Sequence, residues 1–255
     1  MICCVNSIDT IEPAIRSAKW ADEVVVVDSG STDGTDRVAK ELADKFVHEP
    51  WRGSYTSQKQ FGTDQCRNDW VFILDADEEC SEALAKEMQA LTDEELEGLD
   101  LLLMPRENYV LGRVARSWGP DFGSRLFHRK RCTWGDHVLH DIRHPSSPSR
   151  QRKLKHPILH GRYSKTSIEE LFDGAKAAGR LLVVARQRHE KVKRCHWWDL
   201  VFRPTFVFLK HYLLKREVFA GTYGLILSKN AAYATYLKYA ALWVVQKGLA
   251  DHDPK

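Results

Sequence analysis

Five apolar residues, Trp70 to Leu74, are followed directly by Asp75-Ala76-Asp77, and this stretch constrains the fold more than any other. An unbroken run rich in β-branched and aromatic residues predicts a strand that is buried on both faces, as in a parallel sheet. In open α/β sheets, ligands bind beyond the carboxyl ends of the strands. Two carboxylates at such an end can reach one small volume, and hard divalent cations take oxygen ligands that they share with substrate phosphates. The run therefore indicates a metal–diphosphate site, although a polar strand end before a helix cap has the same pattern.

The first hundred residues alternate short apolar runs with segments of helical periodicity, which predicts a parallel α/β sheet. The expected strands cover residues 1–5, 23–27, 46–48, 70–74 and 101–104. The expected helices cover residues 11–20, 35–45, 57–66 and, after a cap at Ser81, 82–91. The first strand begins abruptly and is expected to be short.

The second expected strand ends at Asp28, which opens a loop of small and turn-forming residues that leads into a helix at Thr35. Backbone N–H groups at a helix N-terminus can bind an anion. The loop has neither the Walker nor the Rossmann glycine pattern. We expect Asp28 to contact a nucleotide, with a simple turn-capping role as the alternative.

After Arg106 the periodicity becomes poor, and residues 106–160 are dense in Gly, Pro, Trp, His and Arg. Long irregular segments inside a compact domain often carry function. Beyond them, Ser167-x-x-Glu170 has the form of a capping box and predicts a helix toward Arg194. The last sixty or so residues combine apolar and aromatic side chains with Lys and Arg.

Segments 206–216 and 224–242 in this tail have the composition of basic amphipathic helices. Such helices can lie on an anionic membrane surface, or they can simply pack against the domain, and the sequence leaves both interpretations open.

Length and composition limit the class of protein. The 255 residues, of which 43% are hydrophobic, are enough for one large domain or for one domain with a tail. The net charge is only +3, which argues against bulk nucleic-acid binding. The six cysteines form no Cys-x-x-Cys pair, and no secretory signal is visible, so we expect a cytosolic protein with reduced thiols. No apolar run is long enough to predict a transmembrane helix.

Three stretches, Val24–Thr35, Gln58-Lys59 and Leu74–Glu78, together resemble the family 2 glycosyltransferases of the GT-A fold. Four later stretches resemble the bacterial lipopolysaccharide-core β-1,4-glucosyltransferase group: Arg106–Gly112, Trp118–Asp121, Arg125–Phe127 and His140-Asp141. The resemblance covers residues 9–160 well and the tail more loosely. It implies an α/β fold of the GT-A nucleotide-diphospho-sugar transferase type, with a mostly parallel central sheet flanked by helices. The catalytic domain would span residues 1–165, and a helical C-terminal extension would span 166–255.

The resemblance implies an inverting transfer of a hexose from a nucleotide-diphosphate sugar to a lipopolysaccharide-core or related lipid-linked envelope glycan. UDP-glucose is the expected donor, and Mg²⁺ or Mn²⁺ the expected cofactor. The protein would be cytoplasmic or peripheral on the cytoplasmic face of the inner membrane.

The resemblance also assigns roles to individual residues. Those implied to bind the nucleotide sugar are Asn6, Asp28, Ser29, Lys59 and Asp75. Those implied to bind the metal are Asp77 and Asp75. His160 is a further candidate ligand, since imidazole suits Mn²⁺ better than Mg²⁺, with a structural loop histidine as the alternative. Trp118, Arg125 and His140 would contact acceptor or phosphate, and for Arg125 a structural pair with a carboxylate is equally open. Asp141 is the first candidate for the general base, and Asp121 is the second. The chain departs from the family pattern at Val5-Asn6-Ser7, where Lys-Asn-Glu is usual, at Gly119 in Trp-Tyr-Pro-Asp, and at Asp141 in His-Glu.

General chemistry leads to the same requirements. The leaving diphosphate must be neutralised, which a divalent metal does as a Lewis acid. A carboxylate must accept the proton of the acceptor hydroxyl, on the face opposite the leaving group by analogy with inverting glycosidases. Two other functions remain open: a nucleotidyltransferase, whose usual Gly-rich loop with Arg and Lys is absent, and a degenerate homologue that binds nucleotide sugar or a partner without turnover.

Overall fold

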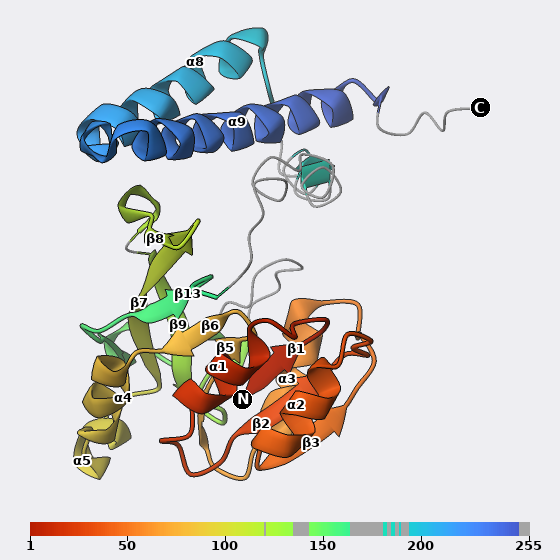
Figure 1. The fold of residues 1–255 in the computed structure, drawn as a ribbon, viewed down its shortest axis with the longest axis vertical. Helices are drawn as coiled ribbons and strands as arrows, with labels where there is room; N and C mark the ends of the chain where they lie inside the picture. Colours follow the sequence, from red (N-terminus) through yellow and green to blue (C-terminus); the bar gives the residue numbers. More distant parts are fainter. Residues whose placement is uncertain are drawn as a thin grey trace. The chain divides into compact units, whose positions relative to one another are not determined.

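The computed structural model describes residues 1–119, 121–134, 143–163, 181–182, 185–186, 189 and 194–249. The chain forms two compact units, Met1–Lys165 and Thr166–Lys255, whose elements are labelled in Figure 1. The start of the helix expected at Ser167 lies outside the described residues. Among those described, no helix combines the length and the apolar character needed to cross a bilayer.

The first unit contains a four-stranded parallel sheet in the order β3–β2–β1–β5. Its strands are β1 (Ile2–Cys4), β2 (Val25–Asp28), β3 (Lys45–His48) and β5 (Leu74–Asp75). The helices beside it in Figure 1 are α1 (Ile11–Ser17), α2 (Thr35–Leu42) and α3 (Tyr55–Asp64). The predicted α/β fold with a parallel sheet and a helical C-terminal region is confirmed.

The consecutive valines of β2 show why this sheet is buried on both faces. Val24 and Val26 belong to the larger core cluster, which contains the apolar side chains of α1. Val25 and Val27 belong to a second cluster, against which Phe61 of α3 packs. Since successive side chains of a strand point to opposite faces, four valines in a row serve both layers.

The run Trp70–Leu74 is divided between two sheets, so the prediction of one continuous strand is wrong. Its first part is β4 (Trp70–Phe72), which pairs antiparallel with β9 (Asp121–His128). Its last part enters β5, which pairs with β1. At the crossing point, Ile73 N–H donates to the carbonyl oxygen of Arg125 at 2.8 Å. The run is apolar throughout because it is packed in both sheets.

The second sheet has seven strands and mixed direction, along the path β4–β9–β7–β13–β6, with β12 and β8 also paired to β7. The strands not yet given are β6 (Glu78–Cys80), β7 (Leu101–Val110), β8 (Arg113–Val114), β12 (Gln151–Lys153) and β13 (Ile158–His160). Much of the segment expected to be irregular is therefore β-structure. The strand signal is weak because β9 contains a glycine and a buried arginine, and because a register shift interrupts β7 between Leu102 and Leu103.

Short elements complete the first unit. They are α4 (Glu82–Gln89), α5 (Asp93–Glu97), the 3₁₀ turns η1 (Arg116–Trp118) and η2 (Pro148–Arg150), and the hairpin of β10 (Thr133–Trp134) and β11 (Arg143–His144). The predicted cap of α4 is confirmed, because the Ser81 hydroxyl accepts a hydrogen bond from Leu84 N–H.

The second unit contains a helical hairpin. Its elements are α8 (Trp197–Leu209), the π turn η3 (Lys210–Leu214), the 3₁₀ turn η4 (Glu217–Ala220) and α9 (Gly221–Gln246). Arg203 joins the two helices, since it forms an ion pair with Asp199 at 2.5 Å and lies over the ring of Tyr239. Gly224 is buried where α9 passes η4, and a Cβ atom there would overlap the carbonyl oxygen of Glu217.

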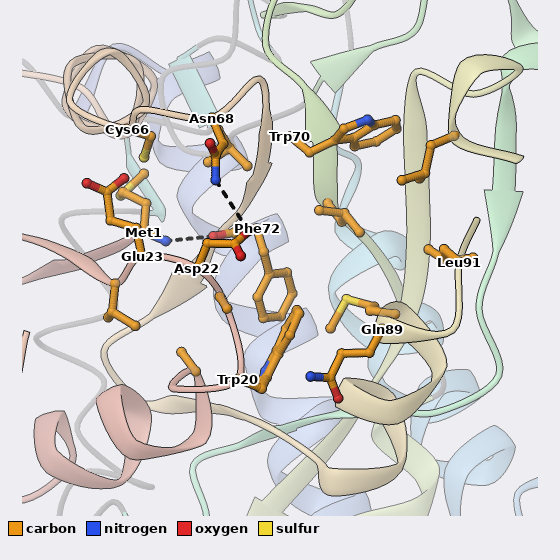
Figure 2. A pocket seen from close by; sticks show the side chains of 17 residues that line it. Met1, Trp20, Asp22, Glu23, Cys66, Asn68, Trp70, Phe72, Gln89 and Leu91 are labelled. Atoms are coloured by element: carbon orange, nitrogen blue, oxygen red, sulfur yellow. Dashed lines mark hydrogen bonds between the residues drawn. The ribbon is translucent and has the colours of Figure 1, made fainter. Parts of the chain in front are cut away.

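A cavity of about 450 Å³ lies in the first unit, and Figure 2 shows the side chains that line it. The rings of Trp20 and Phe72 meet there with centroids 5.9 Å apart. Met1 and Val24, which line the cavity, precede β1 and β2, so the cavity lies at the amino ends of these strands. The carboxyl ends, where ligands bind in such sheets, are at the opposite edge.

Candidate active site

The polar residues of the candidate site gather at the carboxyl edge of the parallel sheet. Asp28 is the last residue of β2 and Asp75 the last of β5. The two flank β1 in register, with Cys4 opposite Asp28 and Cys3 opposite Asp75. The sheet therefore brings together residues that are far apart in the sequence.

Asp28 folds the loop that follows it. Its carboxylate, whose side chain is 2% exposed, accepts hydrogen bonds from the N–H groups of Gly30 and Ser31, both at 3.0 Å, and from the Ser31 hydroxyl. Burial alone would raise the pKa of Asp28, but these hydrogen bonds outweigh it and hold the pKa below its ordinary value. Gly30, with φ of +102°, supplies the left-handed turn that aims its N–H at the carboxylate. Asp28 thus shapes a loop, and what the loop presents to a ligand is mainly backbone and hydroxyl groups.

Asn6 and Ser29 connect this loop to neighbouring elements. Asn6 Oδ1 accepts from Thr32 N–H at 2.9 Å, and Asn6 N–H donates to the Ser31 hydroxyl at 2.9 Å. The Ser29 hydroxyl accepts from the side-chain amide of Gln58 at 3.1 Å. Both predicted residues therefore lie in the site, and buried Gln58 of α3 positions the second.

The N-terminus of α2 is already occupied by a carboxylate of the chain. Asp33 accepts from Thr35 N–H at 3.0 Å and from Ile8 N–H at 3.1 Å. The first N–H group of this helix is therefore bound by the side chain of Asp33.

Asp75 lies between two cations. Its Oδ1 is 2.6 Å from Nζ of Lys59, and its Oδ2 is 2.8 Å from Nη2 of Arg125. Burial would raise the pKa of Asp75, but the guanidinium of Arg125 and the ammonium of Lys59 hold it well below its ordinary value. The Asp75 side chain is still 37% exposed, whereas that of Lys59 is only 4% exposed. The Asp75 carboxylate is thus partly open to solvent, while the ammonium of Lys59 that pairs with it is buried.

Glu78 completes this network from beneath. Its side chain is fully buried, accepts from Nη2 of Arg125 at 2.6 Å, and accepts from Asp75 N–H at 3.0 Å. Burial raises the pKa of Glu78, and the nearby charge of Asp75 adds to the effect against the attraction of Arg125. Arg125 therefore connects the partly exposed carboxylate of Asp75 to the buried carboxylate of Glu78.

Asp77 and His160 form a second, more exposed pair. His160 Nε2 is 3.4 Å from Asp77 Oδ2, and the two side chains are 33% and 46% exposed. Strand β13 places His160 opposite both Glu78 and Asn108. His160 Nδ1 lies 2.9 Å from Asn108 Oδ1, which leaves Nε2 directed at Asp77.

The donor atoms of this pair suit a divalent cation that is shared with a substrate. A metal-binding histidine usually donates its other ring N–H to a carbonyl or carboxylate oxygen, as His160 does to Asn108. Within the described part of the chain, no cluster of three or more His, Cys, Asp and Glu side chains is placed to hold a metal. Two protein ligands, with the remainder from substrate phosphates and water, is an arrangement that Mg²⁺ accepts. Asp75 fits less well, because both its oxygens are paired with cations.

The remaining predicted residues are only partly brought together. Asp121 begins β9, and its Oδ2 lies 2.5 Å from Nη2 of Arg106. Trp118 is half-buried in η1, where its carbonyl oxygen accepts from the Asn108 amide at 3.2 Å. His140 and Asp141 lie outside the described residues.

Several residues of the site were not assigned a role from the sequence: Gln58, Glu78, Arg106 and Asn108. Glu78 directly follows the Asp75-Ala76-Asp77 motif, yet a glutamate beside a turn is normally a solvated residue. The signal that identifies it, a buried arginine at the same depth, comes from β9 some fifty positions later.

Known proteins resemble this chain in sequence and in structure. A sequence profile described as Glycosyl transferase family 2 matches residues 1–156. LpsC of Rhizobium meliloti, a lipopolysaccharide core biosynthesis glycosyltransferase, is 42% identical over 253 residues, which cover 95% of this chain and 90% of LpsC. A glycosyltransferase of Rickettsia bellii is 30% identical over 258 residues, covering 93% of this chain and 83% of its own. Among solved structures, residues 1–349 of TarS from S. aureus align with a TM-score of 0.46 and 15% identity, over 98% of this chain and 90% of that fragment.

Proposed function

The chain belongs to glycosyl transferase family 2, and from this membership we propose that it moves a hexose from a nucleotide-diphosphate sugar to a glycan of the cell envelope. The donor proposed is UDP-glucose, and the acceptor is a lipopolysaccharide-core or related lipid-linked glycan. The acceptor class is supported by the 42% identity to a lipopolysaccharide core biosynthesis glycosyltransferase. The observation that carries the proposal is the network of Lys59, Arg125 and Asp75 beside Asp77 and His160, at the edge where α/β sheets bind ligands.

The nucleoside would lie against the carboxyl ends of β1, β2 and β5. The Asp28 loop, hydrogen-bonded to Asn6 and Gln58, would form a rigid wall for the nucleobase. The exposed part of the Asp75 carboxylate would accept hydrogen bonds from ribose hydroxyls. Lys59 and Arg125 fix the orientation of that carboxylate, so little reorganisation is needed on binding.

The diphosphate would lie beside Asp77 and His160. A divalent metal held there would act as a Lewis acid on the leaving diphosphate. Asn108 holds the His160 ring so that Nε2 points toward Asp77, and Gly161 N–H donates to the carbonyl oxygen of Asp77 at 2.9 Å. These contacts fix the positions of Asp77 and His160, the two candidate metal ligands, in the absence of a metal.

The proton of the acceptor hydroxyl requires a carboxylate on the acceptor side. We assign this role to Asp141, by its position after His140, where the family motif usually has glutamate. Asp121 is the weaker candidate, because its ion pair with Arg106 competes with proton transfer. In this proposal residues 1–165 are the catalytic domain, and residues 166–255 are an extension.

The test combines the full chain with UDP-glucose, Mn²⁺ and a core oligosaccharide that lacks the transferred hexose. We expect UDP release that depends on acceptor, together with an acceptor heavier by one hexose. Asp77→Ala should lower kcat by at least about 10²-fold, because a metal contributes several kcal/mol to the transition state. Asp36→Ala, which removes an exposed carboxylate of α2, is the matched control and should be active.

Three outcomes would contradict the proposal or part of it. If no nucleotide sugar in a panel supports acceptor-dependent release, the chain is not a transferase of this type. Binding of UDP-sugar without release would instead identify a homologue that retains the nucleotide site but not turnover. Full activity of Asp77→Ala would remove Asp77 from the metal site.

A further inference from the structure

Helix α8 leaves much of its apolar surface in solvent. Val207 and Phe208 are half-buried, and Lys229 of α9 reaches over the ring of Phe208. In contrast, Trp197 is 67%, Phe202 65% and Phe206 62% exposed. A helix that is apolar all round is normally buried all round.

The exposed side chains cover a wide part of the α8 surface. Trp197 and Val201 form one pair at i, i+4 spacing and Phe202 and Phe206 form another, and the two pairs together span about half of the helix circumference. The turn after α8 extends the surface with Leu214, which is 76% exposed, and Phe219, which is 84% exposed. We call these six residues the α8 apolar face. Soluble monomers rarely expose a contiguous apolar patch of this kind without a partner.

The charges around this face are almost entirely positive. Residues 194–249 contain eight Lys and Arg but only two Asp and Glu, Asp199 and Glu217, and both acidic residues are buried. Lys210, Lys215 and Arg216 are exposed at the end of α8. Elsewhere in the chain, acidic residues outnumber basic ones. The positive charge is therefore concentrated in the helical hairpin.

We propose that the α8 apolar face docks on the surface of an anionic phospholipid bilayer. Aromatic side chains would enter the boundary between headgroups and acyl chains, and Lys210, Lys215 and Arg216 would lie among the phosphates. Trp197 and Trp198 are of the type enriched at membrane interfaces, since the indole ring is apolar with one polar group. The helix lies on the membrane without crossing it. This inference does not depend on the donor or the reaction proposed above.

Charge favours a bilayer over a second copy of the chain. In a two-fold dimer each copy would present the same basic residues to the other, with no exposed carboxylate in the hairpin to neutralise them. Anionic headgroups provide the complementary charge. The surface also differs from the one expected from sequence, since Leu227 and Leu242 of α9 are buried and the exposed residues lie mainly on α8 and its turn.

The first test is flotation of the full chain with vesicles of phosphatidylcholine, with and without phosphatidylglycerol. We expect binding that requires phosphatidylglycerol and weakens in salt. The triple variant Lys210→Gln, Lys215→Gln, Arg216→Gln should bind about 10²-fold more weakly, since each basic residue near an anionic surface contributes about fivefold. The control removes three exposed lysines of the first unit, Lys86→Gln, Lys153→Gln and Lys155→Gln, and should bind like the wild type.

The second test concerns the apolar part of the face. Phe202→Ser with Phe206→Ser should weaken binding by at least about tenfold, because each ring loses its apolar burial. Lipids with brominated acyl chains should quench a fluorescence component that Trp197→Phe with Trp198→Phe removes and Trp20→Phe does not. The proposal would be overturned if neither the triple Lys/Arg→Gln variant nor Phe202→Ser with Phe206→Ser weakened vesicle binding, or if the wild-type chain did not float with vesicles at all. A dimer in solution that Phe202→Ser with Phe206→Ser dissociates would also overturn it, and would identify a second copy as the partner.

Discussion

Arg125 is the side chain that holds the candidate site together, because it contacts the exposed carboxylate of Asp75 and the buried one of Glu78. We predict that Arg125→Met lowers the free energy of unfolding by about 3–5 kcal/mol, since a buried carboxylate is left without its partner. Urea unfolding of the purified variant measures this. Adding Glu78→Gln to Arg125→Met should recover part of the loss, because the buried charge is then removed as well. An unchanged urea midpoint in Arg125→Met would mean that the network does not support the fold.

Asp141 and Asp121 can be separated by one pair of substitutions. Asp141→Asn keeps size but removes basicity, and should lower kcat by at least about 10²-fold with donor affinity near the wild type. Asp141→Glu should keep substantial activity, because it restores the residue usual in the family. Steady-state kinetics measures the effect on kcat, and isothermal titration calorimetry with UDP measures the effect on nucleotide affinity. An active Asp141→Asn beside an inactive Asp121→Asn would transfer the role to Asp121.

At the scale of elements, Asp100 ties strand β7 to the segment that follows β11. It is fully buried, accepts from Ser146 N–H at 2.9 Å and pairs with Arg150 Nε at 2.8 Å, while its backbone meets Arg150 and His128. Burial would raise the pKa of Asp100, but Ser146 and Arg150 outweigh it and lower the pKa below its ordinary value.

A lowered pKa means that the folded state prefers the charged form of Asp100. Its contribution to stability is therefore complete above the unfolded pKa of about 3.9 and is lost as the pH falls through the lower, folded value. We predict that Asp100→Asn destabilises the protein by about 1–3 kcal/mol near neutral pH, and that the difference from wild type shrinks in acid. Urea unfolding across pH measures it, with Glu41→Gln on the surface of α2 as the control. A difference that is constant with pH would exclude this account.

The sequence predicts those elements whose signals are local. The valines of β2 and the cap at Ser81 are read within a few residues, and both are found. The crossing at Ile73 and the strand β9 cannot be predicted in this way, because they depend on pairing between residues 70–73 and 125–128. The same holds for the site: Asp75, Asp77 and Arg125 stand out by type and position, whereas Glu78 matters only because Arg125 is brought to it.

At the scale of the whole molecule, the two compact units are proposed to unfold independently. Gly224→Ala places a methyl group against the carbonyl of Glu217, and should destabilise the helical hairpin by about 1–3 kcal/mol or more. In Gly224→Ala we expect hydrogen exchange to become faster in α8 and α9 but not in β1, β2 or β7. In Arg125→Met we expect it to become faster in β1, β2 and β7 but not in α8 and α9. Ala234→Ser, at an exposed position of α9, is the control. Faster exchange throughout the chain in Gly224→Ala would show a single cooperative unit.

The crossing of the chain between two sheets at Ile73 also sets an order of events in time. Lys59 and Asp75 are near neighbours along the chain, but Arg125 reaches Asp75 only after a loop of 50 residues has closed. Closing long loops is slow compared with forming helices and local turns. A nascent or refolding chain therefore pairs β1, β2 and β3 first, since these strands are close in the sequence, and acquires β5 and the full set of charges at the sheet edge last. After dilution from denaturant, recovery of nucleotide binding should lag behind recovery of the helical circular dichroism signal. The time course of nucleotide binding would then report when β9 docks.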